Sequence, residues 1–223
     1  MSRRLVIAID GPSGVGKGTV ARAVAETLGY RHVDTGVMYR AVGWKAVTLG
    51  LALDDEDGLA RLARDLRMEM AGSRVFVDGQ DATQGIRTVE IDRAASAVAR
   101  LPRVREALVG RQRAMGAGGG IVMEGRDIGT VVFPQADVKI FLEASPEERA
   151  QRRANDPAHA GGGTQSVAHL AQEMAARDQQ DSARAASPLS VAADATVVDT
   201  THLSIPAVVS RVLAIVRAKQ PVS

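Results

Sequence analysis

A glycine-rich segment near the start of the chain has the residue types and the spacing needed to bind phosphate. Its sequence is Gly11-Pro12-Ser13-Gly14-Val15-Gly16-Lys17-Gly18-Thr19. Glycines let a backbone wrap closely around an anion, because no side chain blocks the approach. A helix that starts here would add unpaired N–H groups and a positive dipole end, and Lys17 would add a charge for the outer phosphates. We therefore interpret the segment as a nucleotide-binding loop; the alternative is an ordinary tight turn between a strand and a helix.

Arginines occur where predicted strands end, and they could hold further phosphate groups. Arg40 comes shortly after a predicted strand over 31–34, and Arg126 comes directly after one over 121–124. The carboxyl ends of parallel strands meet at one edge of a sheet, so we expect both side chains beside the loop. Arginine grips phosphate with two parallel hydrogen bonds and stabilises the charge of phosphoryl transfer. Further candidates lie on predicted helices: Arg149, Arg152, Arg153, and Arg177 and Arg184 around Asp181.

Most arginines on helices are solvent-exposed and have no binding role, and this is the alternative to a functional role for these residues. Arg149, Arg152 and Arg153 have a spacing that also suits a surface face. We accept the solvated interpretation for four others: Arg61, Arg64, Arg111 and Arg113.

Alternating strands and helices must position these groups, which predicts an α/β fold with a mostly parallel sheet flanked by helices. The expected core strands are 5–9, 31–34, 121–124, 138–142 and 195–199. The expected helices are 20–28, 35–50, 54–66, 90–99, 102–115, 146–153, 167–180 and 205–217. Ser145 and Glu148 have the spacing of a capping box at the helix that starts at 146. Between 67 and 87 the apolar residues alternate, which predicts a small antiparallel sheet inserted into the core. A loop over 155–165 contains three consecutive glycines and is expected to be mobile.

Composition excludes several classes of protein. The chain has 223 residues and a net charge of only +2, whereas a nucleic-acid-binding protein would show a larger basic excess. Aromatic residues make up 3%, which leaves few platforms for stacking bases, and there is no cysteine for disulfides or thiolate metal sites. No apolar stretch is long enough to span a membrane, and Asp10 interrupts the first apolar run, so no signal peptide fits. We expect a single-domain cytoplasmic monomer without nucleic-acid or membrane partners.

Longer strings of residues indicate a family. They are Ile9-Asp10 with the loop, then 34–40, 86–87, 94–99, 102–108, 111–113, 124–134, 177–178 and 187–189. On these segments the chain resembles the bacterial cytidylate kinases (CMP kinases) over almost its full length. The string Gly-Arg-Asp-Ile-Gly-Thr-Val-Val-Phe-Pro over 125–134 is highly specific to that family, whereas the loop alone would indicate only a nucleotide kinase.

The resemblance implies a P-loop kinase fold that transfers the γ-phosphoryl group of ATP to CMP or dCMP, with Mg²⁺ bound to ATP. It implies one domain with a core over 1–66 and 88–223, a CMP-binding insert over about 67–87, and a lid over about 149–165. The ATP-binding residues would be Gly11, Pro12, Ser13, Gly14, Val15, Gly16, Lys17, Gly18, Thr19 and Arg152. The catalytic residues would be Lys17, Arg126, Arg149 and Arg153. No residue is expected to bind a metal directly.

The resemblance also assigns the acceptor site. Arg40, Arg126 and Arg184 would hold the acceptor phosphate, and Asp181 with Arg177 would hold the sugar hydroxyls. Ser96, Arg105 and Asp127 would contact the cytosine edge, while Thr35, Gly36, Tyr39 and Gly125 would line the pocket. A carboxylate at 127 suits the exocyclic amine of cytosine and repels the carbonyl of uracil. The alternative role for Asp127 is a structural cap of the turn after the strand.

Some features depart from the family or from the general loop signature. The residue after Lys17 is Gly18 rather than a hydroxyl residue, so Mg²⁺ contacts through water from Asp34 or Glu124 are an alternative to a capping role for these acids. The predicted lid has Pro157 and a glycine run where the family has a longer polar helix, and Thr35 replaces the commoner serine. Rival functions are a kinase for UMP, AMP or shikimate, and an ATPase or GTPase switch, although no Asn-Lys-x-Asp guanine motif is present.

Overall fold

The computed structural model describes residues 4–72, 74–156 and 166–219. The chain divides into two compact units. The first unit combines residues 1–34, 113–155 and 165–223, and the second combines 35–112 and 156–164. The sheet of the first unit is parallel and that of the second is antiparallel.

The parallel sheet of the first unit has five strands in the order β2-β6-β1-β7-β8, which confirms the predicted α/β fold. The strands are β1 (Val6–Asp10), β2 (Arg31–Asp34), β6 (Ile121–Gly125), β7 (Val138–Glu143) and β8 (Thr196–Asp199). The register aligns Asp10 at the end of β1 with Gly125 at the end of β6. The segments that follow these two strands therefore start side by side at one edge of the sheet.

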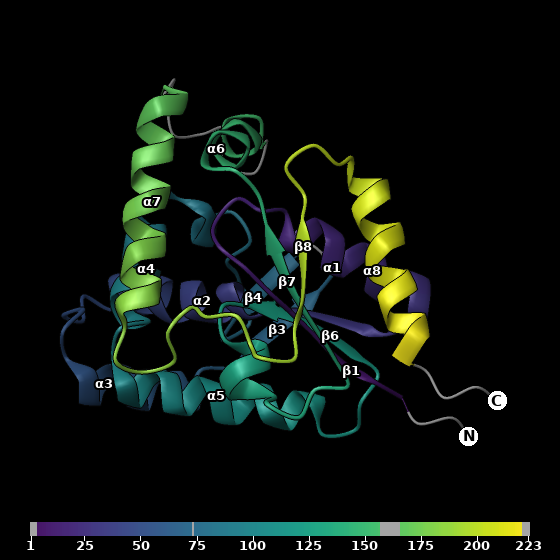
Figure 1. Cartoon of the computed structure of the whole chain (residues 1–223). Helices are drawn as coiled ribbons and strands as arrows, with labels where there is room; N and C mark the ends of the chain where they lie inside the picture. Colours follow the sequence, from purple (N-terminus) through teal and green to yellow (C-terminus); the bar gives the residue numbers. More distant parts are fainter. Residues whose placement is uncertain (1–3, 73, 157–165, 220–223) are drawn as a thin grey trace. The chain divides into compact units, whose positions relative to one another are not determined.

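Helices cover the apolar strands of this sheet. In Figure 1, α1 (Lys17–Leu28) lies beside α8 (Ile205–Lys219), and the two helices contact each other, β6 and β7. The three central strands, β6, β1 and β7, are almost fully buried, as expected where a parallel sheet is covered on both faces. The core between sheet and helices includes Ile7, Ile9, Val20, Val24, Val122, Ile140, Leu142, Val212 and Val216.

Two further helices of the first unit, α6 (Pro146–Ala154) and α7 (Val167–Ala183), pack against each other. Ser145 caps α6 as predicted, because its hydroxyl accepts the N–H of Glu148 at 3.2 Å. The second half of the predicted capping box was wrong. The Ser145 N–H donates to Thr201 Oγ1 instead, and the Glu148 carboxylate accepts from Arg152 at 2.9 Å.

A short π-helical turn over Ile128–Val132 follows β6, and the sequence did not predict it. The backbone carbonyl of Asp127 accepts the N–H groups of both Val131 and Val132, at 2.9 and 3.1 Å. Arg113 is exposed, as predicted, and it also donates to the carbonyls of Val131 and Val132. The arginine stabilises the last turn of a helical segment whose carbonyls would otherwise lack partners.

The second unit consists of helices and a small sheet. Its helices are α2 (Thr35–Thr48), α3 (Glu56–Asp65), α4 (Val89–Val98) and most of α5 (Pro102–Gly116), and its strands are β3 (Met68–Ala71), β4 (Arg74–Val77) and β5 (Gln80–Asp81). The three strands are antiparallel in the order β3-β4-β5, which confirms the small sheet predicted within 67–87. The boundaries of the insert at 67 and 87 stay a prediction.

Small residues bring α2 and α4 close together. A Cβ atom added to Gly43 of α2 would lie 3.0 Å from the Ala95 backbone nitrogen and 3.1 Å from Ala94 Cβ. Arg111 is half-buried and donates to the carbonyls of Ala63 and Leu66 at the end of α3, so the solvated role predicted for this arginine was wrong. Arg61 and Arg64 are exposed, as predicted.

Candidate active site

The glycine-rich loop joins β1 to α1, and its backbone geometry depends on glycine. Gly16 is the residue before α1 and has φ 90°, a left-handed conformation that side chains disfavour. Its carbonyl accepts the N–H of Val20 at 3.1 Å, which starts the helix with Lys17 in its first turn. The strand, loop and helix order that phosphate binding requires is therefore present.

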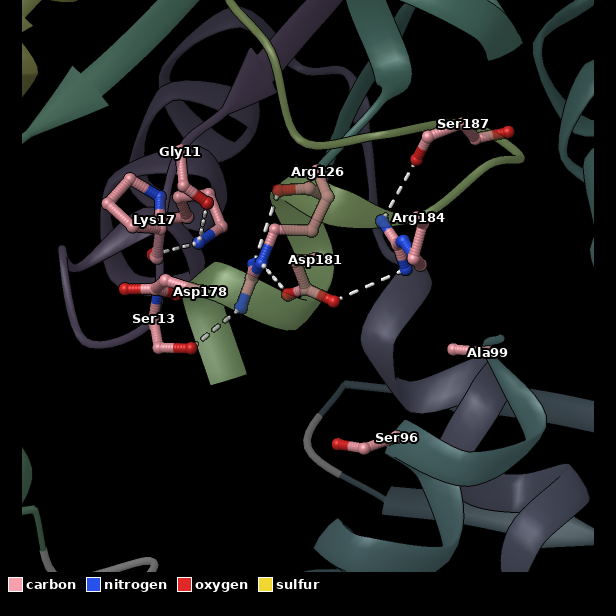
Figure 2. Close-up of polar contacts among 12 residues, drawn as sticks. Gly11, Ser13, Lys17, Ser96, Ala99, Arg126, Asp178, Asp181, Arg184 and Ser187 are labelled. Atoms are coloured by element: carbon pink, nitrogen blue, oxygen red, sulfur yellow. Dashed lines mark hydrogen bonds and ion pairs between the residues drawn. The ribbon is translucent and has the colours of Figure 1, made fainter. Parts of the chain in front are cut away.

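Lys17 is folded back onto the loop. Its Nζ donates to the backbone carbonyls of Gly11 at 2.8 Å and Pro12 at 2.7 Å, and Figure 2 shows the contact with Gly11. Burial, followed by the charge of the nearby Arg126 guanidinium, lowers the pKa of Lys17 from 10.5 to about 7. The carboxylates around it, such as Glu124, oppose this shift only in part. An anionic ligand would supply the negative charge that the buried ammonium group lacks.

Arg126 connects the loop with the end of α7. Figure 2 shows its guanidinium between Ser13 and Asp181: Nη2 donates to Ser13 Oγ at 3.1 Å, and Nε donates to Asp181 at 3.0 Å. Asp181 also pairs with Arg184 at 3.3 Å, and Arg184 donates to the carbonyl of Ser187 at 3.0 Å. Three side chains that the sequence assigned to the acceptor are thus linked to each other and to the loop.

The arginines of α6 also contact the loop. Arg149 Nη1 donates to the Ser13 carbonyl at 3.0 Å and to the Asp178 carboxylate of α7. Arg152 donates to the Val15 carbonyl of the loop at 3.3 Å, and to the Thr200 hydroxyl and carbonyl after β8 at 2.9 and 2.7 Å. These contacts fix both arginines beside the loop, where a nucleotide phosphate would bind. The predicted lid over about 149–165 lies partly outside the described residues, and its closing motion stays a prediction.

A buried aspartate at the end of β1 holds the turn after β6. Asp10 accepts the N–H of Ile128 at 2.9 Å and of Gly129 at 2.7 Å. Burial raises the pKa of Asp10 from 3.8 to about 6, although these two hydrogen bonds favour its charged form. Asp127 makes no side-chain cap at the turn that follows it. The alternative capping role for Asp127 is therefore filled by Asp10.

The Glu124 side chain lies against Gly18, the loop residue that follows Lys17. A Cβ atom added to Gly18 would lie 3.1 Å from Glu124 Oε1, and the same oxygen is hydrogen-bonded to His32 Nε2 at 3.0 Å. Burial, followed by the charge of Asp34, raises the pKa of Glu124. Glycine at position 18 thus leaves room for a carboxylate next to the loop. Within 4–72, 74–156 and 166–219, no group of three or more acidic or histidine residues could hold a metal ion.

The second unit holds the remaining predicted acceptor residues. Arg40 Nε donates to Asp92 at 2.9 Å, and Ser96 Oγ donates to the Asp92 carbonyl at 3.0 Å, so α2 and α4 present these side chains together. The Arg105 guanidinium lies 5.3 Å from the centre of the Tyr39 ring, a cation–π contact within this unit.

The structure thus divides the predicted site residues between the units. The first unit contains Gly11, Pro12, Ser13, Gly14, Val15, Gly16, Lys17, Gly18, Thr19, Gly125, Arg126, Asp127, Arg149, Arg152, Arg153, Arg177, Asp181 and Arg184. The second contains Thr35, Gly36, Tyr39, Arg40, Ser96 and Arg105. Sequence reasoning gave no role to Asp178 or Asp10, although Asp178 shares a helix face with Asp181 three residues later. None of the described helices could cross a membrane.

Comparisons with known proteins identify the family. The family model for cytidylate kinase matches residues 7–218. A cytidylate kinase from Pelotomaculum thermopropionicum is 51% identical over 217 residues, which cover 95% of this chain and 96% of that protein. One from Desulfitobacterium hafniense is 49% identical over 222 residues, which cover 98% and 95%. The chain therefore belongs to the cytidylate kinase family, and the resemblance seen in its sequence is confirmed.

The fold is also similar to that of a shikimate kinase from Bacteroides thetaiotaomicron. The TM-score is 0.51 at 11% identity, and the match covers 96% of this chain and 98% of that structure. At this identity the likeness concerns the fold alone.

Proposed function

We propose that this chain transfers the γ-phosphoryl group of ATP to CMP or dCMP, giving ADP and CDP or dCDP. The observation that carries the proposal is the hydrogen bond between Arg126 and Ser13. This bond joins the loop that would bind the phosphates of ATP to the Arg126 guanidinium, which follows the neighbouring strand β6. The guanidinium would bind the phosphate of the acceptor. A nucleotide hydrolase would need only the loop and a positioned water.

The loop residues would bind the donor and stabilise the charge of transfer. The N–H groups at the start of α1 would hold the phosphates, and Lys17 would leave the carbonyls of Gly11 and Pro12 to contact the outer phosphate oxygens. Arg149 and Arg152 would add positive charge from α6. Phosphoryl transfer is mainly a matter of positioning and charge stabilisation, so the attacking group is an oxygen of the acceptor phosphate and no protein nucleophile is required.

Magnesium would arrive bound to ATP, where it neutralises phosphate charge and orients the transferring group. Glu124 is the carboxylate next to Gly18, and oxygen ligands suit this ion, often through water. A carboxylate oxygen beside the loop is a suitable partner for water bound to this ion. We therefore propose that Glu124 contacts water bound to the ion rather than acting as a helix cap.

We propose roles for the predicted acceptor residues of each unit. Arg40, Arg126 and Arg184 would pair with its phosphate, and Asp181 with Arg177 would bind the sugar hydroxyls. Asp127, Ser96 and Arg105 would hydrogen-bond the cytosine edge, and Thr35, Gly36, Tyr39 and Gly125 would line the pocket. We also propose that the protein acts in the cytoplasm.

The test is to incubate the purified protein with Mg·ATP and one acceptor at a time, and to measure ADP and the phosphorylated product. The acceptors are CMP, dCMP, UMP, AMP and shikimate. We expect product with CMP and dCMP at a much higher kcat/KM than with the others. ADP formation at the same rate without any acceptor would instead support a hydrolase, and the proposal would fail.

A further inference from the structure

Helix α7 presents two carboxylates, one turn apart, to different partners. Asp181 pairs with Arg126 and Arg184, which belong to the proposed acceptor set. Asp178, three residues earlier, accepts the backbone N–H of Ser13 at 2.9 Å and pairs with Arg149. Figure 2 shows Asp178 close to Ser13 in the loop and Asp181 beside Arg126. One helix face therefore contacts both the donor loop and the acceptor arginines.

The two partners of Asp178 are also bonded to each other. Arg149 Nη1 donates to the Ser13 carbonyl at 3.0 Å and to Asp178, so its two hydrogens have two acceptors. Both peptide groups of Ser13 are thus held, the N–H by Asp178 and the C=O by Arg149. A guanidinium is planar, so two fixed acceptors on one nitrogen set the direction of the whole group.

Close packing also holds the loop against α6 and α7. A Cβ atom added to Gly14 would lie 2.4 Å from Met174 Cε on α7 and 2.9 Å from the Arg149 carbonyl on α6. The loop therefore lies directly against both helices. Asp178 and Arg149 have side chains that are only 15% and 11% exposed, so water competes little for this ion pair.

We propose that Asp178 is a positioning residue for phosphoryl transfer, which fixes the donor loop to α7 and aims Arg149 at the transferring group. The inference rests on the proposed function and gives a role to a side chain that does not itself contact a phosphate. A carboxylate so close to the donor phosphates would repel them, and its pairing with Arg149 offsets this cost. In a reaction that depends on positioning, a small displacement of Arg149 lowers the rate strongly. We therefore expect a larger effect on kcat than on acceptor binding.

The experiment compares Asp178→Asn with a control of equal charge change, Glu173→Gln. Glu173 lies on the same helix, is exposed, and pairs only loosely with His169 at 3.6 Å. The asparagine keeps an oxygen for the Ser13 N–H but loses the charge that holds Arg149. We expect Asp178→Asn to lower kcat on the order of 10-fold or more, with KM for CMP changed by less than about 3-fold. Glu173→Gln should change neither constant. An unchanged kcat in Asp178→Asn would overturn the proposal.

A second arm separates positioning of Arg149 from general support of the fold. In an Arg149→Met background, Asp178→Asn should cost less than about 3-fold in kcat, because its target is already absent. Equal losses in both backgrounds would show that Asp178 acts otherwise, and the proposal would be wrong. If Asp178→Asn does not fold, Asp178→Glu keeps the charge on a longer side chain. It should then hold its melting temperature and lose kcat, whereas an unchanged kcat would refute the positioning role.

A third measurement distinguishes failure of this inference from failure of the proposed function. Calorimetric binding of ADP needs no acceptor, and Asp178→Ala should weaken it by about 3- to 10-fold through the loosened loop, while Glu173→Gln should not. If the unmodified protein binds ADP but does not phosphorylate CMP, the acceptor is wrong and the loop part of the inference is still tested. If Asp178→Ala binds ADP as tightly as the unmodified protein, the loop part is wrong.

Discussion

Binding of ADP to the loop should transfer a proton from solvent to Lys17. In the ligand-free protein the pKa of Lys17 is lowered to about 7, first because of burial and then because of Arg126. The phosphates of ADP would add negative charge close to the ammonium group, and an opposite charge raises the pKa of a lysine. The bound lysine should therefore stay protonated well above neutral pH.

The size of this uptake follows from the pKa. At pH 8 a lysine with a pKa of about 7 is charged in roughly one molecule in ten, so full protonation on binding takes up about 0.9 proton. At pH 7 the uptake falls to about 0.5 proton, and at pH 6 to about 0.1. The terminal phosphate of the ligand has its own pKa near about 6, so pH 8 isolates the lysine best.

Calorimetry in several buffers measures the uptake. At each pH the observed enthalpy of Mg·ADP binding is plotted against the ionisation enthalpy of the buffer, and the slope is the number of protons taken up. Lys17→Arg should reduce the slope at pH 8 to near zero, since a guanidinium is always charged. Lys139→Arg is the matched control. Lys139 is equally buried but paired with Asp194 at 2.8 Å, so the slope should not change.

A slope near zero for the unmodified protein at pH 8 would refute this reasoning, because Lys17 would then be charged before the ligand arrives. A slope that rises as the pH falls from 8 to 6 would refute it as well. If Lys17→Arg binds no ADP, the pH profile of the unmodified protein still decides the matter.

Four further predictions concern other parts of the site. Gly14→Ala should lower kcat on the order of 10-fold or more, because Gly14 has φ +71° and the added methyl group would lie 2.9 Å from the Arg149 backbone carbonyl. A normal kcat in steady-state kinetics would show that the loop can shift. Arg40→Ala should raise KM for CMP about 10- to 100-fold through loss of a charged hydrogen bond, with ADP affinity in calorimetry unchanged; the reverse pattern would place Arg40 on the donor side. Asp127→Asn should reduce the preference for CMP over UMP by about 1–3 kcal/mol in kcat/KM at an unchanged melting temperature, and a lower melting temperature with the same preference would count against base contact. The pKa of Asp10 is about 6 in the folded protein against 3.8 for the ordinary side chain, so its stabilising contribution is present below pH 4 and lost as the pH rises through 6. In denaturant titrations, the free energy of unfolding of the unmodified protein should fall relative to that of Asp10→Asn by on the order of 3 kcal/mol between pH 4 and 7. A difference that stays constant over this range would exclude the titration of Asp10.

Local sequence patterns predicted the parts of the structure that local physics decides. The strand before the loop, the loop and α1 are contiguous, and their glycines and apolar spacing were sufficient to identify them. The cap of Ser145 on α6 was likewise visible, because a cap depends on residues three positions apart. The other half of that capping box failed because Arg152, one helical turn after Glu148, competes for its carboxylate.

Contacts between distant segments were the ones that sequence patterns missed. Arg111 was expected in solvent, but it donates to two carbonyls at the end of α3. Arg113 is exposed as expected, yet its hydrogen bonds to the turn after β6 were not predicted. Asp10 was seen only as an interruption of an apolar run, although it anchors the turn after β6. Hydrogen-bond partners of this kind depend on the order of the strands in the sheet. The spacing of residues within one segment carries no information on that order.

The central position of β1 has a consequence for the synthesis of the chain. The neighbours of β1 in the sheet are β6 and β7, and Ile7 pairs with Val138, about 130 residues later. At about 5–20 residues per second, a ribosome needs roughly 7–26 s to make the second neighbour after the first strand. Until β6 has been made this apolar strand has both hydrogen-bonding edges open, and until β7 has been made it still has one, which is the template that aggregation uses. We therefore expect the nascent chain to be most prone to aggregation before β7 has left the ribosome, and a chain truncated before β7 would lack a strand that pairs with β1.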